Sequence, residues 1–501
     1  MHLENETDVC ITEVAAAPPV DPDELAAQHK RHWTPLGLAE WLIMVLGSMF
    51  RYIAETGTWI VWAGERWHQD VASIRMFRFC KATLRHMLQH PNVGADLLKD
   101  FRIWVNSCET EPMFKQVLAL ARTDRSIAIS VNQLDQHPDY LCCANGVVDL
   151  KTGELLANTP GLYLTRNTGV PYQPDAKFPQ WDAFLEQATG GNPSVHDFLQ
   201  LAIGYSLQGS CREEKFFILH GPGATGKSTV LEAISGALGD YHVAANFGTF
   251  LKKDRVSSSG PSEDIARLAG ARFVTASECD DGQRFAEATL KQLTGGDKVN
   301  ARFLYQNSFD YRPQFKLFLA VNHLPFLATD DPAIWRRLIR IPFEHRPKHI
   351  ETSLKSLFST PEAKAAILAW AVKGAVRWYQ AGLVVPADIQ AANEWAREEM
   401  DPIAAFLKEE CLIDHRCFNA ITPFRQKYEE WAAANGQRYV LDRRRWNRAL
   451  DAKGFQQGTR KMKDGNKARC WLGIVWVGQD EEQRERVLAQ LYPNDQGLFS
   501  S

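Results

Sequence analysis

Three apolar runs in the middle of the chain predict buried β-strands. They lie at residues 215–220, 272–278 and 315–321, and each contains Phe together with Leu, Ile or Val. Such runs, each ended by a polar or glycine-rich segment, are typical of strands in an α/β core. After the first run the pattern changes to helical spacing from Ser228 onward. We therefore expect a strand, a loop and a helix in succession.

The residues before this core predict a mixture of helices and strand pairs. The aromatic runs 58–62 and 65–67 flank Ala63-Gly64 and predict a hairpin. Helical periodicity then continues to about residue 125, and a further strand and turn follow at 145–155. An α+β, largely helical region is therefore expected ahead of the core.

The last third of the chain predicts a small basic domain. From residue 403 to 477 the pattern indicates three helices followed by a final strand pair, an order that resembles a winged helix. Residues 437–470 hold eleven Lys and Arg residues against three Asp. Because phosphate contact requires local positive charge, we expect this region to contact DNA. The alternative is a solvated basic face or a surface that docks a partner protein.

The composition limits the class of protein. The chain has 501 residues, 45% hydrophobic and 23% charged, with a formal net charge of -3, which is typical of a globular protein of several domains that is not basic throughout. The apolar run 36–50 contains Glu40 and is shorter than a bilayer requires, so we expect a buried helix and no membrane association. Ten cysteines occur without a CxxC pair, which indicates reduced thiols rather than zinc ligands. Without an evident signal peptide, the expected location is the cytoplasm.

The segment after the first strand has the spacing of a phosphate-binding loop. Glycines allow backbone N–H groups to close around phosphate oxygens, a lysine reaches the terminal phosphates, and a hydroxyl holds Mg²⁺. The helix that follows favours anions at its N-terminus. We therefore predict that ATP and Mg²⁺ are bound, with Ser228 as a metal ligand, by Gly221, Pro222, Gly223, Ala224, Thr225, Gly226, Lys227, Ser228 and Thr229.

Polar residues that follow the other two strands complete a candidate hydrolytic site. Glu278 ends the second strand, and a carboxylate there can activate the attacking water and approach the metal. Asn322 follows the third strand as a candidate sensor of the γ-phosphate, although strands also end in Asn because it tolerates turn dihedrals. Either Arg336 or Arg337 can stabilise a transition state in an adjacent subunit. The alternative for this pair is a surface helix with a salt bridge.

Five segments taken in order closely resemble the phage and plasmid primase-helicase family, whose motor is a superfamily 3 helicase. They are 221–228, 271–278, 291–297, 320–325 and 334–338. Residues 145–155 and 204–209 look like the domain that precedes this motor in poxvirus-type and phage enzymes, so the resemblance covers roughly 37–475. It implies an AAA+-like P-loop core in a hexameric ring that hydrolyses ATP at subunit interfaces and translocates on single-stranded DNA, typically 3′ to 5′. It also implies the roles given above for Lys227, Glu278, Asn322 and the arginine pair.

The elements and the resemblance together predict how the chain is organised. We expect a flexible lead at 1–36, an α+β and helical domain at 37–205, a superfamily 3 ATPase domain at 206–346, a helical lid at 347–400, a winged-helix-like domain at 401–480 and a tail at 481–501.

The resemblance further implies a hairpin within 295–311 that points into the ring channel. Family members often have a basic residue near the position of Gln306, whereas this chain has Gln306-Asn307. The DNA contacts are therefore assigned to Lys298, Arg302 and Tyr305, unless these residues only close the hairpin. In the C-terminal region the expected DNA contacts are Arg443, Arg444, Arg445, Arg448, Lys461 and Lys463.

Two functions from different classes fit these patterns. The first is an ATP-driven DNA helicase in the replication of a phage, plasmid or integrated element, acting in a bacterial or phage-infected cytoplasm. The second is a non-unwinding ATP switch that assembles on DNA as an initiator or regulator, which Gln306-Asn307 keeps open. The short lead at 1–36 has no room for a polymerase fold, so primer synthesis is expected from a separate primase.

Overall fold

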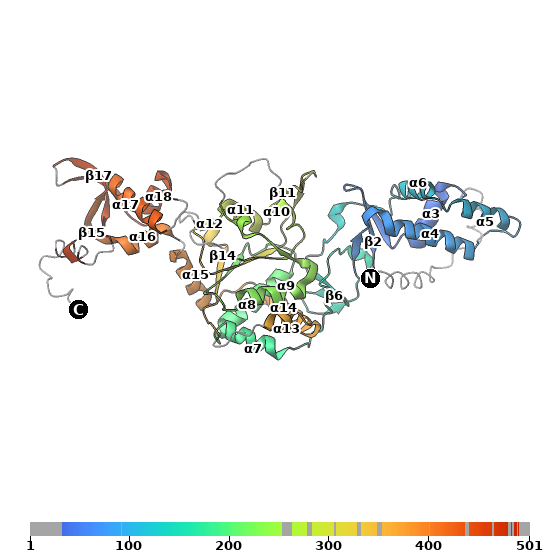
Figure 1. Ribbon diagram of the computed structural model, residues 1–501, viewed down its shortest axis with the longest axis horizontal. Helices are drawn as coiled ribbons and strands as arrows, with labels where there is room; N and C mark the ends of the chain where they lie inside the picture. Colours follow the sequence, from blue (N-terminus) through green and yellow to red (C-terminus); the bar gives the residue numbers. More distant parts are fainter. Residues whose placement is uncertain are drawn as a thin grey trace. The chain divides into compact units, whose positions relative to one another are not determined.

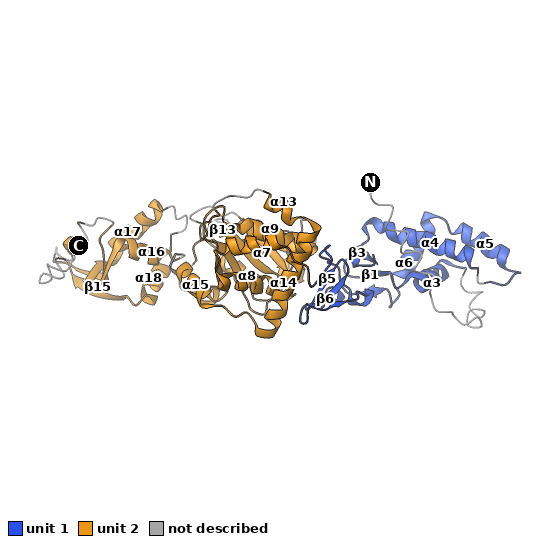
Figure 2. Ribbon diagram, turned by 90° about the horizontal axis from the view of Figure 1, so that it is seen from below, with its two compact units in different colours: residues 1–174 blue, residues 175–501 orange. Residues whose placement is uncertain are grey.

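The computed structural model describes most of the chain in two compact units (Figure 2). The described residues are 33–91, 93–252, 263–277, 283–304, 307–327, 332–347, 353–399, 401–435, 440–462, 465–478, 482, 485–487 and 489. Unit 1 spans residues 1–174 and unit 2 spans residues 175–501. The predicted domain boundaries are finer than this division and stay predictions.

Unit 1 packs helices against a small mixed sheet (Figure 1). The sheet has the order β3-β2-β1-β4 and is built from β1 (Phe50–Ile53), β2 (Thr58–Trp62), β3 (Trp67–Gln69) and β4 (Ala128–Ile129). β2 and β3 pair antiparallel, which confirms the predicted hairpin. The helices are α3 (Pro35–Leu46), α4 (Ile74–Gln89), α5 (Leu98–Ser107) and α6 (Glu111–Ala121).

The apolar run 36–50 is divided between two elements. Thr34 caps α3 by accepting a hydrogen bond from the Gly37 N–H, and Pro35 occupies the first turn, where its missing N–H costs nothing. The helix ends at Leu46, and Phe50 already belongs to β1. The prediction of a helix is therefore confirmed for residues 36–46 of the run. A second sheet of unit 1 contains β5 (Tyr140–Cys143), β6 (Gly146–Asp149) and β7 (Leu155–Leu156), which matches the predicted strand and turn.

The core of unit 2 is a five-stranded parallel sheet with the order β14-β8-β13-β10-β9. The three predicted strands are present as β8 (Phe216–His220), β10 (Phe273–Ser277) and β13 (Lys316–Val321). β9 (His242–Ala244) and β14 (Leu338–Pro342) lie at the two edges and were not predicted. The central strands are almost continuously buried, as expected when helices cover both faces of a parallel sheet.

Helices before and after the sheet in sequence pack against each other. α8 (Pro193–Leu207) precedes β8, and α14 (Pro361–Ala381) follows β14. Their backbones touch at Gly204 and Gly374, where a Cβ on Gly204 would lie 2.0 Å from the Gly374 carbonyl carbon. A side chain at either position would separate the helices. The remaining helices of this part are α7 (Pro179–Ala188), α9 (Lys227–Leu238), α10 (Glu263–Ala266), α11 (Glu287–Thr294), α12 (Pro332–Trp335), α13 (Leu354–Phe358) and α15 (Ala387–Glu399).

A short antiparallel hairpin interrupts the sheet crossover between α11 and β13. It consists of β11 (Val299–Ala301) and β12 (Phe309–Tyr311), so the predicted strand, turn and strand within 295–311 are confirmed. Phe303 and Phe309 stack across it with ring centroids 5.8 Å apart. Residues 305–306 at its turn lie outside the described residues.

The C-terminal elements enclose a separate hydrophobic core that contains Phe406, Trp446 and Trp471. Their order is helix, strand, helix, helix, strand, strand, with a three-stranded sheet ordered β15-β17-β16. The expected three helices and final strand pair are present, but the first strand, β15, was missed because its alternation is interrupted by Asp414-His415-Arg416. The elements are α16 (Pro402–Glu410), β15 (Cys411–Ala420), α17 (Ile421–Ala434), α18 (Arg443–Ala452), β16 (Gln456–Lys461) and β17 (Lys467–Trp476).

Candidate functional site

The predicted phosphate loop joins the end of β8 to the start of α9. Gly226 has a φ of +92° immediately before the helix, a conformation that glycine adopts without steric penalty. A Cβ on Gly221 would lie 1.9 Å from the Phe343 carbonyl oxygen, so no larger residue fits there. The glycines thus serve both the turn of the loop and its close contact with the chain after β14.

Lys227 is the most constrained side chain of this loop. It is 7% exposed, and its ammonium donates hydrogen bonds to the carbonyl oxygens of Gly221 and Pro222, both at 2.7 Å, and to the Thr225 hydroxyl at 3.3 Å. Burial, followed by the charge of Arg346, lowers the pKa of Lys227 below its usual range. The loop therefore holds a partly desolvated cation at its centre, where an anion would gain most from it.

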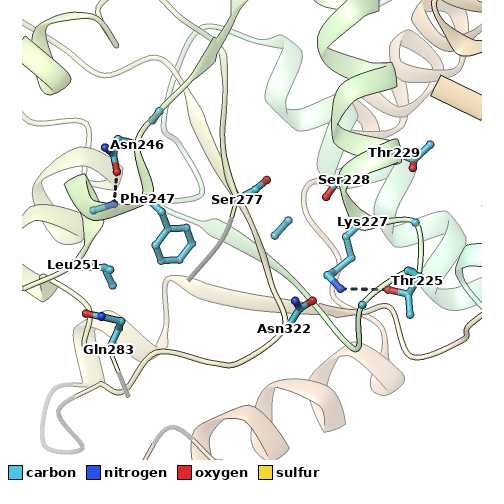
Figure 3. A pocket seen from close by; sticks show the side chains of 16 residues that line it. Thr225, Lys227, Ser228, Thr229, Asn246, Phe247, Leu251, Ser277, Gln283 and Asn322 are labelled. Atoms are coloured by element: carbon cyan, nitrogen blue, oxygen red, sulfur yellow. Dashed lines mark hydrogen bonds between the residues drawn. The ribbon is translucent and has the colours of Figure 1, made fainter. Parts of the chain in front are cut away.

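A pocket of about 770 Å³ opens at the carboxyl edge of the sheet beside the loop. In Figure 3, Lys227, Ser277 and Asn322 surround the same opening, although they come from three separate segments. This follows from the register, because Val321 pairs with His220 and Ser277 pairs with Ala320, so the ends of the three strands are level. Residues 223–229 also line the pocket. The geometry therefore brings together Lys227, Ser228, Thr229 and Asn322, as expected from the sequence.

Glu278, the predicted catalytic acid, lies outside the described residues. The strand before it ends at Ser277, whose side chain is exposed in the pocket. The role of Glu278 therefore stays a prediction.

Several residues of the site were not found from the sequence. The opposite wall of the pocket is formed by Asn246, Phe247, Gly248 and Leu251, with Gln283 beside them. Asn246 begins this turn by accepting a hydrogen bond from the Gly248 N–H at 2.8 Å. No sequence signal connects this wall with the phosphate loop, because the tertiary fold brings them together.

His220 is a partly buried group that the sequence did not reveal. Arg340 donates a hydrogen bond from Nε to His220 Nδ1 at 3.0 Å, and the ring also hydrogen-bonds the backbone of Asn322. Trp395 of α15 stacks on the His220 ring at 5.4 Å and on the Arg340 guanidinium at 4.3 Å. Burial, followed by the charge of Arg340, lowers the pKa of His220 to about 4. This cluster, defined as His220, Arg340 and Trp395, connects the residue before the loop with Asn322 and α15.

The two arginines that follow α12 differ in their surroundings. Arg337 is buried and contacts Glu214 at 2.6 Å, and it also donates to the Ala333 carbonyl oxygen at 2.8 Å. The Arg336 side chain is 65% exposed, with a longer contact of 3.3 Å to Glu214. Arg337 is thus committed to its own chain, whereas Arg336 is accessible.

The predicted DNA-contacting residues fall into two groups. Lys298 and Arg302 are exposed on the hairpin, and Tyr305 lies outside the described residues. The second group is exposed on α18 and β16 and comprises Arg443, Arg444, Arg445, Arg448 and Lys461, whereas Lys463 lies outside the described residues. Asp442 caps α18 and also contacts Arg445 at 3.7 Å.

Other kinds of site were sought among the described residues only. There, no helix has the length and apolarity to cross a membrane. The same part of the chain contains no group of three or more His, Cys, Asp or Glu side chains arranged to hold a metal ion. The eight described cysteines are free thiols.

Two protein families match separate stretches of the chain. Residues 39–190 match the family described as D5 N terminal like, and residues 219–337 match a family of unknown function, DUF5906. The second stretch contains the phosphate loop, Asn322 and both arginines.

The chain is also similar to several viral proteins with helicase names. It is 32% identical over 230 residues to the "Putative helicase L207/L206" of Acanthamoeba polyphaga mimivirus, which covers 45% of this chain and 24% of that protein. Similar proteins of Invertebrate iridescent virus 3 and Frog virus 3 are 27% and 26% identical over 42% and 43% of this chain. The chain thus matches about a quarter of the length of these relatives, at 24%, 23% and 24%.

Among solved structures, the apo C-terminal region of NrS-1 aligns over 88% of this chain and 99% of that chain. The sequence identity is 10% and the TM-score is 0.44. This TM-score is too low to support an argument about the fold, which is described from the sheet order and register above.

Proposed function

We propose that this chain, a relative of the phage and plasmid primase-helicases, is an ATP-driven DNA helicase that acts in DNA replication. The observation that carries the proposal is the pocket in which Lys227, Ser228 and Asn322 meet at the carboxyl edge of a parallel sheet. Ligands of such sheets bind at this edge, and a glycine loop before a helix suits phosphate. The names of the viral relatives support helicase activity in particular.

The nucleotide chemistry follows from the residues of this pocket. On binding, the γ-phosphate of ATP would replace the carbonyl and hydroxyl partners that now hold the Lys227 ammonium. The exposed Ser228 hydroxyl is suited to Mg²⁺ and the exposed Asn322 amide to the γ-phosphate or the attacking water. Mg²⁺ supplies charge neutralisation of the phosphates when bound. Glu278 is proposed to accept the proton of the attacking water.

We assign the arginine that acts in a neighbouring subunit to Arg336. A residue that stabilises the transferred phosphate of another subunit has to be accessible, and Arg336 is, whereas the guanidinium of Arg337 is occupied by Glu214 and Ala333. This assignment requires the ring, with six subunits as the expected number, that the family resemblance implies. The fold proposed for this part is an AAA+-like P-loop core of the superfamily 3 type.

The C-terminal domain is proposed to be a winged helix that contacts DNA through α18. Its helix, strand, helix, helix, strand, strand order suits this fold, in which the last strand pair forms the wing. Arg443 and Arg444 are exposed at the start of α18, and Lys461 lies beside the turn between β16 and β17. These cations can contact DNA phosphates without reading the base sequence.

A strand-displacement assay on forked DNA tests the proposal. Wild-type protein with ATP and Mg²⁺ should displace the labelled strand, while Glu278→Gln should bind the fork and ATP without displacement. Forks with a single 3′ or 5′ tail test the expected 3′ to 5′ direction. Electron microscopy of Glu278→Gln on the fork tests for a closed ring.

The second candidate function is a non-unwinding ATP switch on DNA. It is favoured by one feature of the sequence, Gln306-Asn307 in place of the basic residue that would be expected to grip the strand. If wild-type protein hydrolyses ATP in the presence of single-stranded DNA but never displaces a partner strand, the switch replaces the motor.

A further inference from the structure

Helix α4 of unit 1 presents a row of cations that the helicase proposal does not use. Its sixteen residues include Arg75, Arg78, Lys81 and Arg85 but no carboxylate. Arg78, Lys81 and Arg85 are exposed, and within the described part of the chain none of the three has a carboxylate partner. By comparison, the exposed Lys115 and Lys151 of the same unit each contact a carboxylate, that of Glu111 and that of Asp139.

The spacing of these cations places them on one face of the helix. Residues 74, 78, 81 and 85 follow the i, i+4, i+7, i+11 pattern of a single helical face. The opposite face is buried in the core of unit 1 through Met76, Cys80, Thr83, Leu84 and Met87. From Arg78 to Arg85 the row extends along the helix by about 10 Å, a length suited to several successive phosphates of one strand.

The turn before α4 adds exposed apolar side chains to the start of this row. Val71 is 70% exposed and Ile74 is 54% exposed. Between them, Ala72 and Ser73 have φ values of +56° and +58°, which are unfavourable for residues with a Cβ. These two apolar side chains therefore extend from a turn that costs conformational energy.

Asp70 holds this turn in place through hydrogen bonds to the first turn of α4. Its carboxylate is buried and accepts hydrogen bonds from the backbone N–H groups of Arg75 and Met76, both at 2.9 Å. The first turn of α4 thus receives its cap from a residue that lies outside the two strained positions. Strained backbone positions cluster at functional sites, which makes this turn a candidate binding surface.

We propose that this surface, defined as Val71, Ile74, Arg78, Lys81 and Arg85, binds single-stranded DNA independently of the C-terminal domain. The three cations contact successive phosphates, and Val71 and Ile74 contact bases or sugars at the end of the row. A single strand fits better than a duplex because its unstacked bases are accessible to apolar side chains, whereas a duplex covers them. The proposal goes beyond the helicase activity and does not depend on nucleotide hydrolysis.

The test is equilibrium binding of the full chain to a fluorescent oligo(dT), without nucleotide, over a series of salt concentrations. The test variant combines Arg78→Ala, Lys81→Ala and Arg85→Ala. The control combines Lys115→Ala, Arg125→Ala and Lys151→Ala, which removes the same charge from other exposed positions of unit 1. All six side chains are exposed, so thermal unfolding of both variants should match that of wild type.

For three lost phosphate contacts, the slope of log affinity against log salt should become shallower by about 2, with affinity roughly 10- to 100-fold weaker at 0.1 M salt. The control variant should keep the wild-type slope. A second variant, Val71→Ser with Ile74→Ser, should weaken binding without changing the slope.

Three outcomes would overturn the proposal. The test variant could bind oligo(dT) with the wild-type slope, or the control could lose as much as the test variant. In parallel titrations with duplex DNA and with vesicles containing phosphatidylserine, the test variant could lose affinity for one of these ligands and not for oligo(dT). A chain that fails to hydrolyse ATP but shows the predicted slopes would contradict the helicase function and leave this surface intact.

Discussion

Replacing Trp395 with alanine tests whether the cluster of His220, Arg340 and Trp395 supports the proposed nucleotide pocket. Trp395 is 42% exposed and does not line the pocket, and neither do His220 and Arg340, on which it stacks, so the substitution leaves every proposed ATP contact in place. It removes the stacking contact of the Trp395 ring with His220 and its cation–π contact with the Arg340 guanidinium. His220 in turn contacts the backbone of Asn322 and precedes Gly221 in the chain.

The expected size of the effect follows from the two lost contacts. A cation–π contact at a partly exposed site is worth about 1 kcal/mol, and an aromatic stack adds ~0.5–1.5 kcal/mol. Together they amount to about 2 kcal/mol of support for His220 and Arg340. If all of it were expressed in the nucleotide-bound state, affinity would fall by roughly 30-fold. We therefore expect Trp395→Ala to weaken ATP binding by about 5- to 30-fold, because part of the support is common to the free and bound states.

The assay is titration of a fluorescent ATP analogue into the full chain, together with kcat and KM for ATP hydrolysis on single-stranded DNA. Trp395→Phe keeps a ring over His220 and should remain within about threefold of wild type. Trp104→Ala is the matched control, because Trp104 also stacks, on Trp33 in unit 1, at 6.0 Å. If Trp395→Ala binds and hydrolyses ATP within twofold of wild type, the cluster does not position the pocket. A loss that Trp104→Ala shares would indicate general destabilisation instead.

Three further predictions concern unit 2. Gly374→Ala should lower the free energy of unfolding by about 3 kcal/mol or more in chemical unfolding, because it forces two helix backbones apart. The control Gly236→Ala should be neutral or stabilising, since only the flexible Lys364 side chain lies near Gly236. Arg336→Ala should abolish most ATP hydrolysis with an unchanged melting temperature, whereas Arg337→Ala should lower the melting temperature by several degrees; the reverse pattern would contradict the assignment in trans. Burial lowers the pKa of His242 from 6.5 to about 4, so the unfolded chain takes up a proton in this interval that the folded chain does not, and stability should fall as pH decreases from 6.5 toward 4. His242→Gln should flatten this dependence in thermal unfolding at pH 7, 6 and 5, and an unchanged slope would show that His242 is not its source.

The central strands of unit 2 could be predicted because a strand that is buried on both faces has a continuous run of apolar residues. β8, β10 and β13 are such runs. β9 and β14 could not be predicted from such a run. β9 (His242–Ala244) is short and partly exposed. β14 contains Arg340 and directly follows the two arginines after α12. The surface helix with a salt bridge, which was the alternative for the arginine pair, ends at Trp335 just before the two arginines, and its salt bridge is present between Arg337 and Glu214.

The candidate site divides in the same way. Residues that follow a strand or belong to the predicted phosphate loop have a local signal, and of these residues 223–229 and Asn322 line one pocket. The wall at Asn246 and the cluster around His220 have no local signal, because the distance between their segments in sequence is large and only the folded chain brings them together. The difference in exposure between Arg336 and Arg337 depends on the position of Glu214, which is distant in sequence, so the residues next to the arginines could not predict it.

The position of β8 in the sheet has a consequence for synthesis of the protein. β8 lies between β13 and β14, both of which come later in the chain, and Phe216 pairs with Leu338. At about 5–20 residues per second, roughly 6–25 s pass between the emergence of these two residues from the ribosome. The run Phe216–Leu219 has two open edges until β13 emerges and one open edge until β14 emerges, and an open edge can pair with the same run of a neighbouring nascent chain. The strand before the predicted phosphate loop is therefore also the segment at which we expect aggregation to begin when the protein is overproduced.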